Sequence, residues 1–348
     1  MDNTAITGHA FPFIEVSGTA YDMGYQHGKQ AADLVHKYLV WIEKLTGKFR
    51  DELCQNARAF HPLIEKLSPL LMEEIRGLAD GAGISFDEAL LCQARGEAAS
   101  VPPEGCTAFA LTGSATADGY PLAGQNQDLA VEYADVAILL HVCPSDGRPR
   151  ALLFTFAGQL GYSGMNQYGL AHFANALYDC PWQMGLPHYP LKRIMLEQRD
   201  LDTCLRILRQ HPTCSAGNMV FCFGDGQIAD LEIRPEGVMQ FADTHPDAIV
   251  HANHYLTPEF APCETNSLAD SCPRRDRMRD LVKEHWGDIT VDTMKAILSD
   301  HDGDPAAICR HGAVDMFSIS GYIAEPAKGL LHVRRGLGCT GTWTAYEI

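Results

Sequence analysis

The sequence predicts an α+β protein in which antiparallel sheets are covered by helices. Apolar residues recur with a helical period through the first hundred residues, whereas short runs with a period of two begin after residue 105. Strands that follow strands, instead of alternating with helices, favour antiparallel sheets. No Ser-, Gly- and Pro-rich linker or charge run divides the 348 residues, so we expect a single domain over residues 1–348.

Helices are expected first along the chain. Apolar residues recur every three to four positions across residues 22–45, which predicts an amphipathic helix. A second helix is expected from Ser68 and Pro69, a cap followed by proline at the first helical position, to Gly81. A capping box that begins at Ser85 predicts a third helix.

Strands dominate the rest of the chain, with helical segments between them. Alternating apolar residues predict strands at residues 107–112, 136–142, 151–156, 219–224, 228–233, 314–320 and 330–335. The helical period returns around residues 189–210, 273–285 and 291–299. The strands are thus expected to form sheets onto which the helices pack.

Composition and charge restrict the partners that the chain can bind. Asp and Glu number 44 against 27 Lys and Arg, a formal net charge of −17, and no cluster of basic residues stands out. This argues against nucleic acid and anionic membranes as partners. The N-terminus carries no basic stretch followed by an apolar one, and no run of about 18 apolar residues occurs, so a cytoplasmic location is expected. Twelve cysteines are scattered singly, as in proteins of a reducing compartment.

The candidate nucleophile is Cys106, which follows the loop Pro102-Pro103-Glu104-Gly105 and opens a predicted strand. Gly105 would allow the distorted backbone and close approach that attack of the Cys106 thiol on the Gly105 carbonyl requires. An N-to-S acyl shift followed by hydrolysis would cut the chain between Gly105 and Cys106. The new α-amino group, with a pKa of about 8, would then serve as the base. From the dipeptide alone, a buried cysteine that enters a strand is the commoner explanation.

A series of short motifs runs between residues 18 and 311. They are GTAYDMGYQHG (18–28), EEIRGLADGAG (73–83), GCTAF (105–109), GQNQDL (124–129), HANH (251–254), DSCPR (270–274) and ICRH (308–311). In this order they resemble the penicillin acyltransferase (isopenicillin N acyltransferase) family of self-processing cysteine hydrolases. The resemblance implies the N-terminal-nucleophile hydrolase fold, a four-layer αββα sandwich, in which residues 1–105 and 106–348 stay associated after cleavage. Two departures, Glu104 for aspartate and Gln127 for tryptophan, remove no group that the mechanism needs.

The same resemblance assigns roles to four residues. Cys106 would be the nucleophile, and Asn253 would donate a hydrogen bond to the oxyanion, a role worth about 3 kcal/mol of barrier. Asp128 would orient the α-ammonium group and hold a proton through self-cleavage and turnover. Arg310 would pair with Asp128 or the processing loop and keep the carboxylate charged. Without the resemblance, Asn253 is explained as an ordinary turn residue and Asp128 as an exposed residue at a strand end. Arg310 is then an ordinary surface arginine.

Other candidate residues are weighed and set aside. Ser271 and Arg274, at a predicted helix start, either support the site or cap the helix, and capping is the more frequent role for such a serine. The H-x-x-H pair at 251–254, and His301 with His311, raise the question of a metal site. The zinc-peptidase spacing H-E-x-x-H is absent, so structural histidines are expected and no metal is predicted. Glycine motifs for nucleotides are also missing, and no cofactor is implied.

The expected function is hydrolysis of a small N-acyl amide through a thioester on Cys106. In the close alternative, acyl transfer, an amine takes the acyl group instead of water, and the residues do not decide between the two. Two other classes stay open. One is a papain-like thiol enzyme that is never cut and pairs Cys106 with one of 15 histidines, and the other is a ligand-binding protein that has lost reactivity. The expected partners are a small-molecule substrate and the chain's own cleaved piece.

Overall fold

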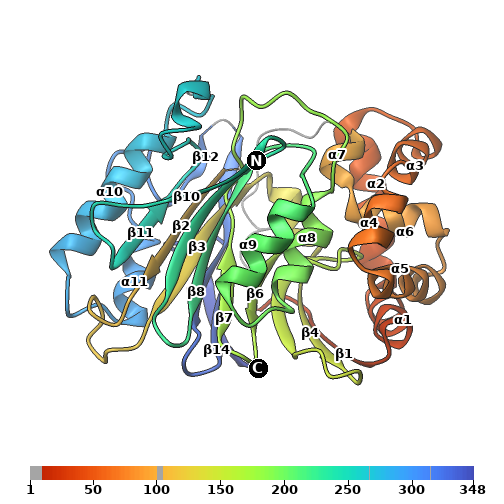
Figure 1. Cartoon of the computed structure of the whole chain (residues 1–348), viewed down its shortest axis with the longest axis horizontal. Coiled ribbons are helices and arrows are strands. Elements are labelled where there is room, and N and C mark those ends of the chain that lie inside the picture. The colour runs from red at the N-terminus through yellow and green to blue at the C-terminus, as the bar shows by residue number, and fades with distance from the viewer. Residues whose placement is uncertain (1–9, 100–104, 266, 314) are drawn as a thin grey trace.

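Two β-sheets pack face to face, with helices on both outer sides (Figure 1). The computed structural model describes residues 10–99, 105–265, 267–313 and 315–348. Helices of the first hundred residues, in red and orange, lie outside one sheet, and helices α10 (Ser271–Glu284) and α11 (Val291–Ile297), in blue, lie outside the other (Figure 1). The four-layer αββα sandwich is therefore confirmed.

The first sheet has eight strands, and each pair is antiparallel except the first. In spatial order they are β1 (Phe13–Gly18), β4 (Ala137–Pro144), β5 (Ala151–Phe156), β6 (Ser163–Asn166), β7 (Leu170–Phe173), β8 (Gly217–Phe223), β9 (Ile228–Arg234) and β10 (Gly237–Phe241). The outer helical layer begins with α1 (Ala20–Gln30), α2 (Ala32–Thr46), α3 (Arg50–Arg58), α4 (His61–Leu67), α5 (Pro69–Ala82), α6 (Phe86–Gln93) and α7 (Arg95–Ala99). Later in the chain, α8 (His188–Met195) and α9 (Leu201–Gln210) join it.

The second sheet carries the predicted nucleophile and is antiparallel throughout. Its strands, in spatial order, are β11 (Ala248–His251), β2 (Gly105–Leu111), β3 (Leu122–Leu129), β13 (Met316–Glu325), β14 (Leu330–Arg335) and β15 (Thr342–Glu347). A short strand, β12 (His311–Ala313), also pairs with β13. Strands β2 and β3 thus lie side by side inside the molecule, and every residue of both is buried.

The helical predictions hold except for two breaks. Residues 22–45 form α1 and α2, separated at Ala31, whose φ of −110° is not helical. Residues 189–210 likewise form α8 and α9. The apolar period continues across both breaks, so the pattern could not show them. Both predicted caps are present, because Ser68 Oγ accepts the N–H of Leu71 and Ser85 forms its capping box.

Strand β3 was missed because its sequence is polar. Gln125, Asn126, Gln127 and Asp128 follow one another and hide the alternation that marks a strand. All four side chains are fully buried and find partners inside the protein. These four residues form a polar segment at the centre of a sheet, beside the predicted nucleophile. Their polar character is explained by the candidate site and not by packing of the core.

Two of the glycine-containing motifs form a single contact between α1 and α5. A Cβ atom on Gly24 would overlap the carbonyl oxygen of Glu74, and one on Gly77 would overlap that of Tyr21. The two helix backbones therefore touch directly, as in other small-residue crossings. This contact fixes the first helical layer against the sheet that it covers.

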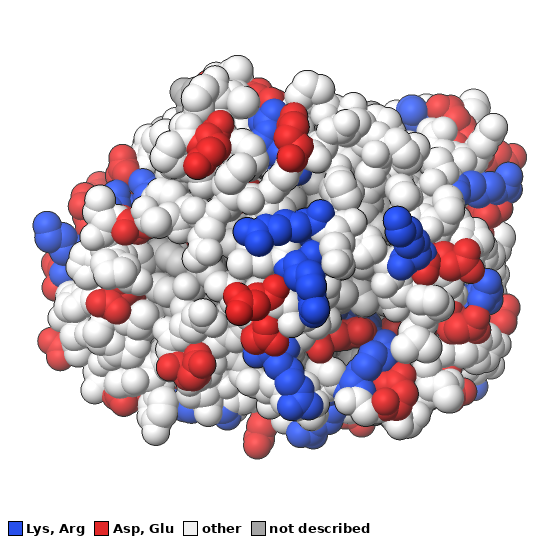
Figure 2. Space-filling view, viewed as in Figure 1, with Lys and Arg blue, Asp and Glu red and all other residues white. Residues whose placement is uncertain are grey.

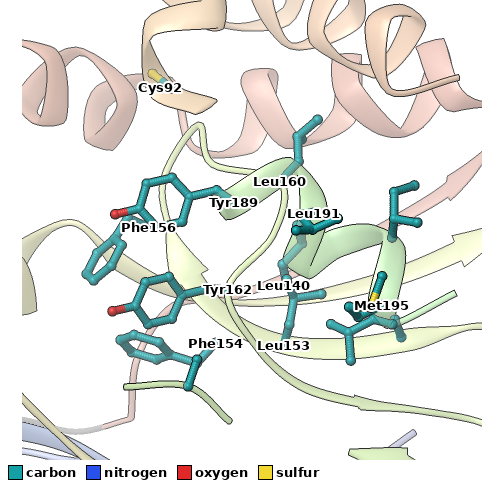
Figure 3. Packing of buried hydrophobic residues seen from close by; sticks show 14 of the residues in the cluster. Cys92, Leu140, Leu153, Phe154, Phe156, Leu160, Tyr162, Tyr189, Leu191 and Met195 are labelled. Atoms are coloured by element: carbon teal, nitrogen blue, oxygen red, sulfur yellow. The ribbon is translucent and has the colours of Figure 1, made fainter. Parts of the chain in front are cut away.

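Helix α8 lies between the first sheet and the helices of the first hundred residues (Figure 3). Leu191 and Met195 face Leu140 and Leu153 of the sheet, and the residues labelled there belong to one buried cluster (Figure 3). On its other side, Arg193 forms a buried two-pronged ion pair with Glu74 of α5, at 3.0 and 3.1 Å. Helix α8 thus joins the sheet to the helical layer.

The surface carries charges of both signs. On the face drawn in Figure 2, Lys and Arg side chains are interspersed with Asp and Glu. Among the described residues, no helix is both long and apolar enough to cross a membrane.

Buried histidines predict how stability depends on pH. Burial lowers the pKa of His27 to about 3 and those of His172 and His188 to about 4, whereas in the unfolded chain each has a pKa of about 6.5. Between these pKa values the unfolded chain binds more protons than the folded chain. The stability that the neutral histidines contribute is therefore complete above pH 6.5 and is lost as the pH falls. For His27 alone, the loss between pH 7 and pH 5 is about 2 kcal/mol.

Urea unfolding of the wild type and of His27→Gln at both pH values isolates this contribution from that of buried carboxyl groups. The wild type is expected to lose about 2 kcal/mol more than the variant on acidification. An equal loss in both proteins would show that His27 is not held neutral in the fold.

Candidate active site

Residues of α7, α8 and β2, and of the segments that follow β7 and precede β8, line a cavity of about 360 Å³. Small-molecule sites commonly have volumes of roughly 300–1,000 Å³. Cys106 forms part of the wall, together with the aromatic residues Tyr162, Tyr178, Trp182 and Tyr189 and the charged residues Glu97, Asp179 and Lys192. The cavity thus offers a small, largely aromatic space next to the predicted nucleophile.

Side chains from two separate segments fix the backbone of Cys106. This residue is the second of β2 and is only 2% exposed. Its N–H donates to Oδ1 of Asn253 at 3.0 Å, and its carbonyl oxygen accepts from Nη1 of Arg274 at 2.7 Å. Because Cys106 begins a strand paired on both sides, its position relative to the cavity is set by the sheet.

Asn253 follows β11 and is itself held on several sides. Its N–H donates to Oγ of Ser271 at 2.7 Å, and Nδ2 donates to the carbonyl oxygen of Ala176 at 3.0 Å. Its Oδ1 accepts from Nη2 of Arg274 at 2.8 Å as well as from Cys106. The amide lies beside Cys106 as the resemblance implied, with its oxygen toward the Cys106 backbone.

Asp128 lies opposite Gly105 on β3, and its carboxyl group is completely buried. Its Oδ1 accepts from Oγ of Ser318 at 2.6 Å. Its Oδ2 has no hydrogen-bond partner among the described residues and lies 3.8 Å from Arg274 and 4.0 Å from Arg310. Burial raises the pKa of Asp128, although both arginines act against it. Desolvation thus outweighs the two nearby cations in its effect on the pKa, and the expected role of Arg310 in keeping the carboxylate charged stays a prediction.

Among the described residues, Arg310 forms a close ion pair with Asp270, whose Oδ2 lies 2.5 Å from Nη2. The Arg310 guanidinium also explains why residue 105 is a glycine, because a Cβ atom there would collide with Nη1 of Arg310. Gly105 lies in the regular strand β2 and its φ is not left-handed. The close approach of Arg310 thus accounts for glycine at this position, and the distorted backbone expected for the attack stays a prediction. The rest of the processing loop, residues 100–104, falls outside the described residues.

Ser271 and Arg274 belong to the site, although sequence reasoning set them aside. Ser271 does not cap α10, because Asp270 is the N-cap residue and forms no side-chain cap. Arg274 is fully buried and donates to Cys106, Asn253 and Oγ1 of Thr107. The sequence signal that could have identified both residues is the D-S-x-x-R spacing, because it places the two side chains at the same end of one helix.

Comparisons with known proteins show to which family the chain belongs. A family model described as acyl-coenzyme A:6-aminopenicillanic acid acyl-transferase matches residues 115–319. The 40 kDa form of acyl-coenzyme A:6-aminopenicillanic-acid-acyltransferase from Emericella nidulans is 30% identical over 307 residues, 85% of this chain and 84% of that protein. The chain belongs to this acyl-transferase family. The predicted family, and with it the prediction that the chain is an enzyme, are thereby confirmed.

More distant similarities extend over most of the chain. An uncharacterised protein of Archaeoglobus fulgidus is 22% identical over 84% of this chain, which spans 58% of that protein. Conjugated bile acid hydrolase from Clostridium perfringens aligns with a TM-score of 0.47 and 13% identity, over 70% of this chain and 97% of its own. Penicillin V acylase from Agrobacterium tumefaciens aligns with a TM-score of 0.48 and 11% identity, over 70% and 86%.

In this member of the acyl-transferase family, a buried asparagine also lines the cavity. Asn175, two residues after the end of β7, lines the same cavity as Cys106 and is only 3% exposed. Neither its Oδ1 nor its Nδ2 has a hydrogen-bond partner among the described residues, and a buried amide without a partner is costly. Its backbone is held by Asn218, whose Oδ1 accepts the Asn175 N–H at 2.6 Å. Sequence reasoning missed it, because only the fold brings residue 175 beside Cys106.

The histidines at 251 and 254 have protein partners. His251 lies 3.1 Å from Oε1 of Glu232, and His254 lies 2.7 Å from Oγ of Ser271. Glu232 also accepts the backbone N–H of Thr257 at 3.1 Å. These buried contacts hold the turn that presents the neighbouring asparagine of the site.

Proposed function

We propose that the chain cuts itself between Gly105 and Cys106 and then hydrolyses a small N-acyl amide through a thioester on Cys106. The observation that carries this proposal is the position of Cys106. It opens a central strand on the wall of a cavity, with Asn253 on its N–H and Arg274 on its carbonyl oxygen. A residue held in this way keeps its place when the preceding peptide bond is broken.

Self-cleavage would begin with attack of the Cys106 sulfur on the Gly105 carbonyl carbon. The peptide bond between the two residues breaks, the nitrogen of Cys106 takes a proton, and a thioester joins Gly105 to the sulfur. Water then hydrolyses the thioester and releases the Gly105 carboxylate. Asp128 is the candidate group for the proton transfers, because it lies opposite Gly105 and burial raises its pKa above the usual value of a carboxyl group.

Turnover would repeat this chemistry on the substrate. The α-amine of Cys106, beside Oδ1 of Asn253, takes the thiol proton, and the sulfur attacks the substrate carbonyl. The amine product leaves with a proton, and water resolves the thioester to a carboxylate. The amide groups of Asn253 and Asn175 are the candidate donors to the oxyanion, because Asn253 contacts the backbone of Cys106 and Asn175 lines the same cavity as Cys106. Arg310 would position the strand start through its approach to Gly105.

The acyl group is expected to be apolar or aromatic. Tyr162, Tyr189 and Leu177 line the cavity, and the two tyrosine rings stack with centroids 5.9 Å apart. Acyl transfer to an amine is the second candidate function. It is favoured by the similarity to the Emericella enzyme, whose name gives acyl-coenzyme A and 6-aminopenicillanic acid as its substrates.

An uncut Cys/His thiol enzyme receives less support. His188 also lines the cavity, but its Nε2 lies 3.0 Å from Oγ of Ser215. Burial lowers the pKa of His188 to about 4. A histidine engaged in this way is less suited to serve as the base for Cys106 than a free α-amino group with a pKa of about 8.

Arg274→Lys is expected to lower kcat for amide hydrolysis by about 100-fold or more and to leave KM nearly unchanged. The Arg274 guanidinium donates from two separate nitrogen atoms, whereas a lysine ammonium donates from one and cannot reproduce this geometry; small misplacements of a nucleophile cost this much. Steady-state kinetics measures the effect, with thermal unfolding to confirm a folded protein. Arg279→Lys, on the exposed side of the same helix, is the control. Wild-type kcat in Arg274→Lys would contradict the assigned role.

Denaturing intact-mass spectrometry with N-terminal sequencing tests self-cleavage. Two pieces, residues 1–105 and 106–348, with the larger one beginning Cys-Thr-Ala-Phe, are the expected result. Partition of the acyl group between water and added amines then separates hydrolysis from transfer. A single uncut chain with full amidase activity would overturn the α-amine mechanism and favour the thiol/histidine alternative.

A further inference from the structure

Four side chains that could bind a metal converge on the side of Arg310 away from the cavity. His301 follows α11, Cys309 and His311 flank Arg310, and Cys339 lies between β14 and β15. One ligand atom from each lies within 4.8 Å of the other three. We propose that these two histidines and two cysteines bind a zinc ion. Sequence reasoning considered only the two histidines, because Cys339 is distant along the chain.

The distances suit a tetrahedral site. Zinc–sulfur bonds of about 2.3 Å and zinc–nitrogen bonds of about 2.0–2.1 Å place sulfur and nitrogen ligands about 3.6 Å apart. The sulfur atoms of Cys309 and Cys339 each lie 3.5 Å from Nε2 of His311. Nε2 of His301 lies 2.7 Å from the same atom, and binding would separate the two rings by about 0.6 Å. A hydrogen bond between the rings would account for only two of the four groups.

The donor set favours zinc over harder cations. Two thiolates and two imidazoles form a closed set, typical of structural zinc sites, whereas magnesium and calcium prefer oxygen ligands.

The segments that carry the ligands are held together by other contacts. The N–H of Cys309 donates to the carbonyl oxygen of Asp300 at 2.9 Å, next to His301. Oγ of Ser299 donates to the carbonyl oxygen of Gly338 at 2.7 Å, next to Cys339. Zinc would therefore enter a site that the loops have already formed, and little ordering would oppose binding.

The site would also position Arg310. Cys309 and His311 point to the cluster, while the Arg310 side chain between them extends toward Asp128 and Asp270. A metal bound to Cys309 and His311 would hold the backbone on both sides of Arg310 and so restrain the position of the arginine. The ion itself would take no part in the chemistry, because the four protein ligands complete its coordination.

Metal analysis of the full-length chain, purified after growth with zinc, tests the proposal. The wild type is expected to contain about one zinc ion per chain. Exchange for cobalt should give the intense visible bands of a tetrahedral site and the near-ultraviolet absorption of thiolate ligands. Cys339→Ser changes an exposed loop residue, which spares the fold. This variant is expected to bind zinc at least 100-fold more weakly, since even losses beyond the direct ligands cost roughly 10–100-fold.

Cys143→Ser is the matched control, because Sγ of Cys143 lies 3.6 Å from His141 but outside the cluster. It should keep the zinc content and the cobalt spectrum of the wild type. A wild-type chain with neither zinc nor a tetrahedral cobalt spectrum would overturn the proposal. So would a disulfide between Cys309 and Cys339 in freshly purified protein, or equal zinc affinity in Cys339→Ser and the wild type.

Discussion

Cys106→Ala is expected to leave the chain as one piece and to abolish amide hydrolysis. Both steps of the proposed mechanism need the same sulfur atom, first for the acyl shift at Gly105 and then for attack on the substrate. Loss of a nucleophile of this kind lowers turnover on the order of 10⁶-fold. The methyl group of alanine leaves the N–H and the carbonyl oxygen of residue 106 free to keep their bonds to Asn253 and Arg274. The fold should therefore be intact.

This variant separates self-cleavage from cutting by a host protease. Mass spectrometry should find pieces of 105 and 243 residues in the wild type and a mass of 348 residues in Cys106→Ala. Cys143→Ser, at a partly buried cysteine of the other sheet, should be cut and active like the wild type. If Cys106→Ala were also cut after Gly105, an external protease would be responsible, and the proposed acyl shift would be wrong.

Gly77→Ala is expected to destabilise the protein by about 3 kcal/mol or more. Helix propensity alone predicts the opposite sign, because alanine is favoured over glycine inside a helix by about 1 kcal/mol. The added Cβ atom, however, would overlap the carbonyl oxygen of Tyr21 on α1. A backbone carbonyl cannot rotate away as a side chain can, so α1 and α5 must separate and open the core between them.

Urea unfolding at neutral pH measures this effect as a change in the free energy of unfolding. Gly237→Ala, in strand β10, is the control, because a Cβ atom there would meet no other atom within 4 Å. It should change stability by no more than about 0.5 kcal/mol. A Gly77→Ala protein as stable as the wild type would show that α1 and α5 are not in backbone contact.

The sequence by itself predicted the features that depend on local pattern. Apolar spacing and capping residues placed α5 and α6, and alternation placed β2 and β13, because these signals lie within a few turns of chain. The Gly105-Cys106 dipeptide at the start of a strand offered a candidate nucleophile, although the dipeptide alone favoured a buried structural cysteine. The ordered motifs then indicated the family, which the comparisons confirmed.

Only the tertiary structure decided which distant side chains meet and in what environment. Arg274 looked like a helix-start residue until the fold buried it against Cys106, and Asn175 gained a role only as part of the cavity wall. The raised pKa of Asp128 follows from desolvation, which depends on everything packed around it. The same holds for Cys309 and Cys339, which lie in different segments and meet only in the fold. Local sequence patterns determine helices and strands, but the burial of a side chain and its contacts with distant residues depend on how the whole chain packs.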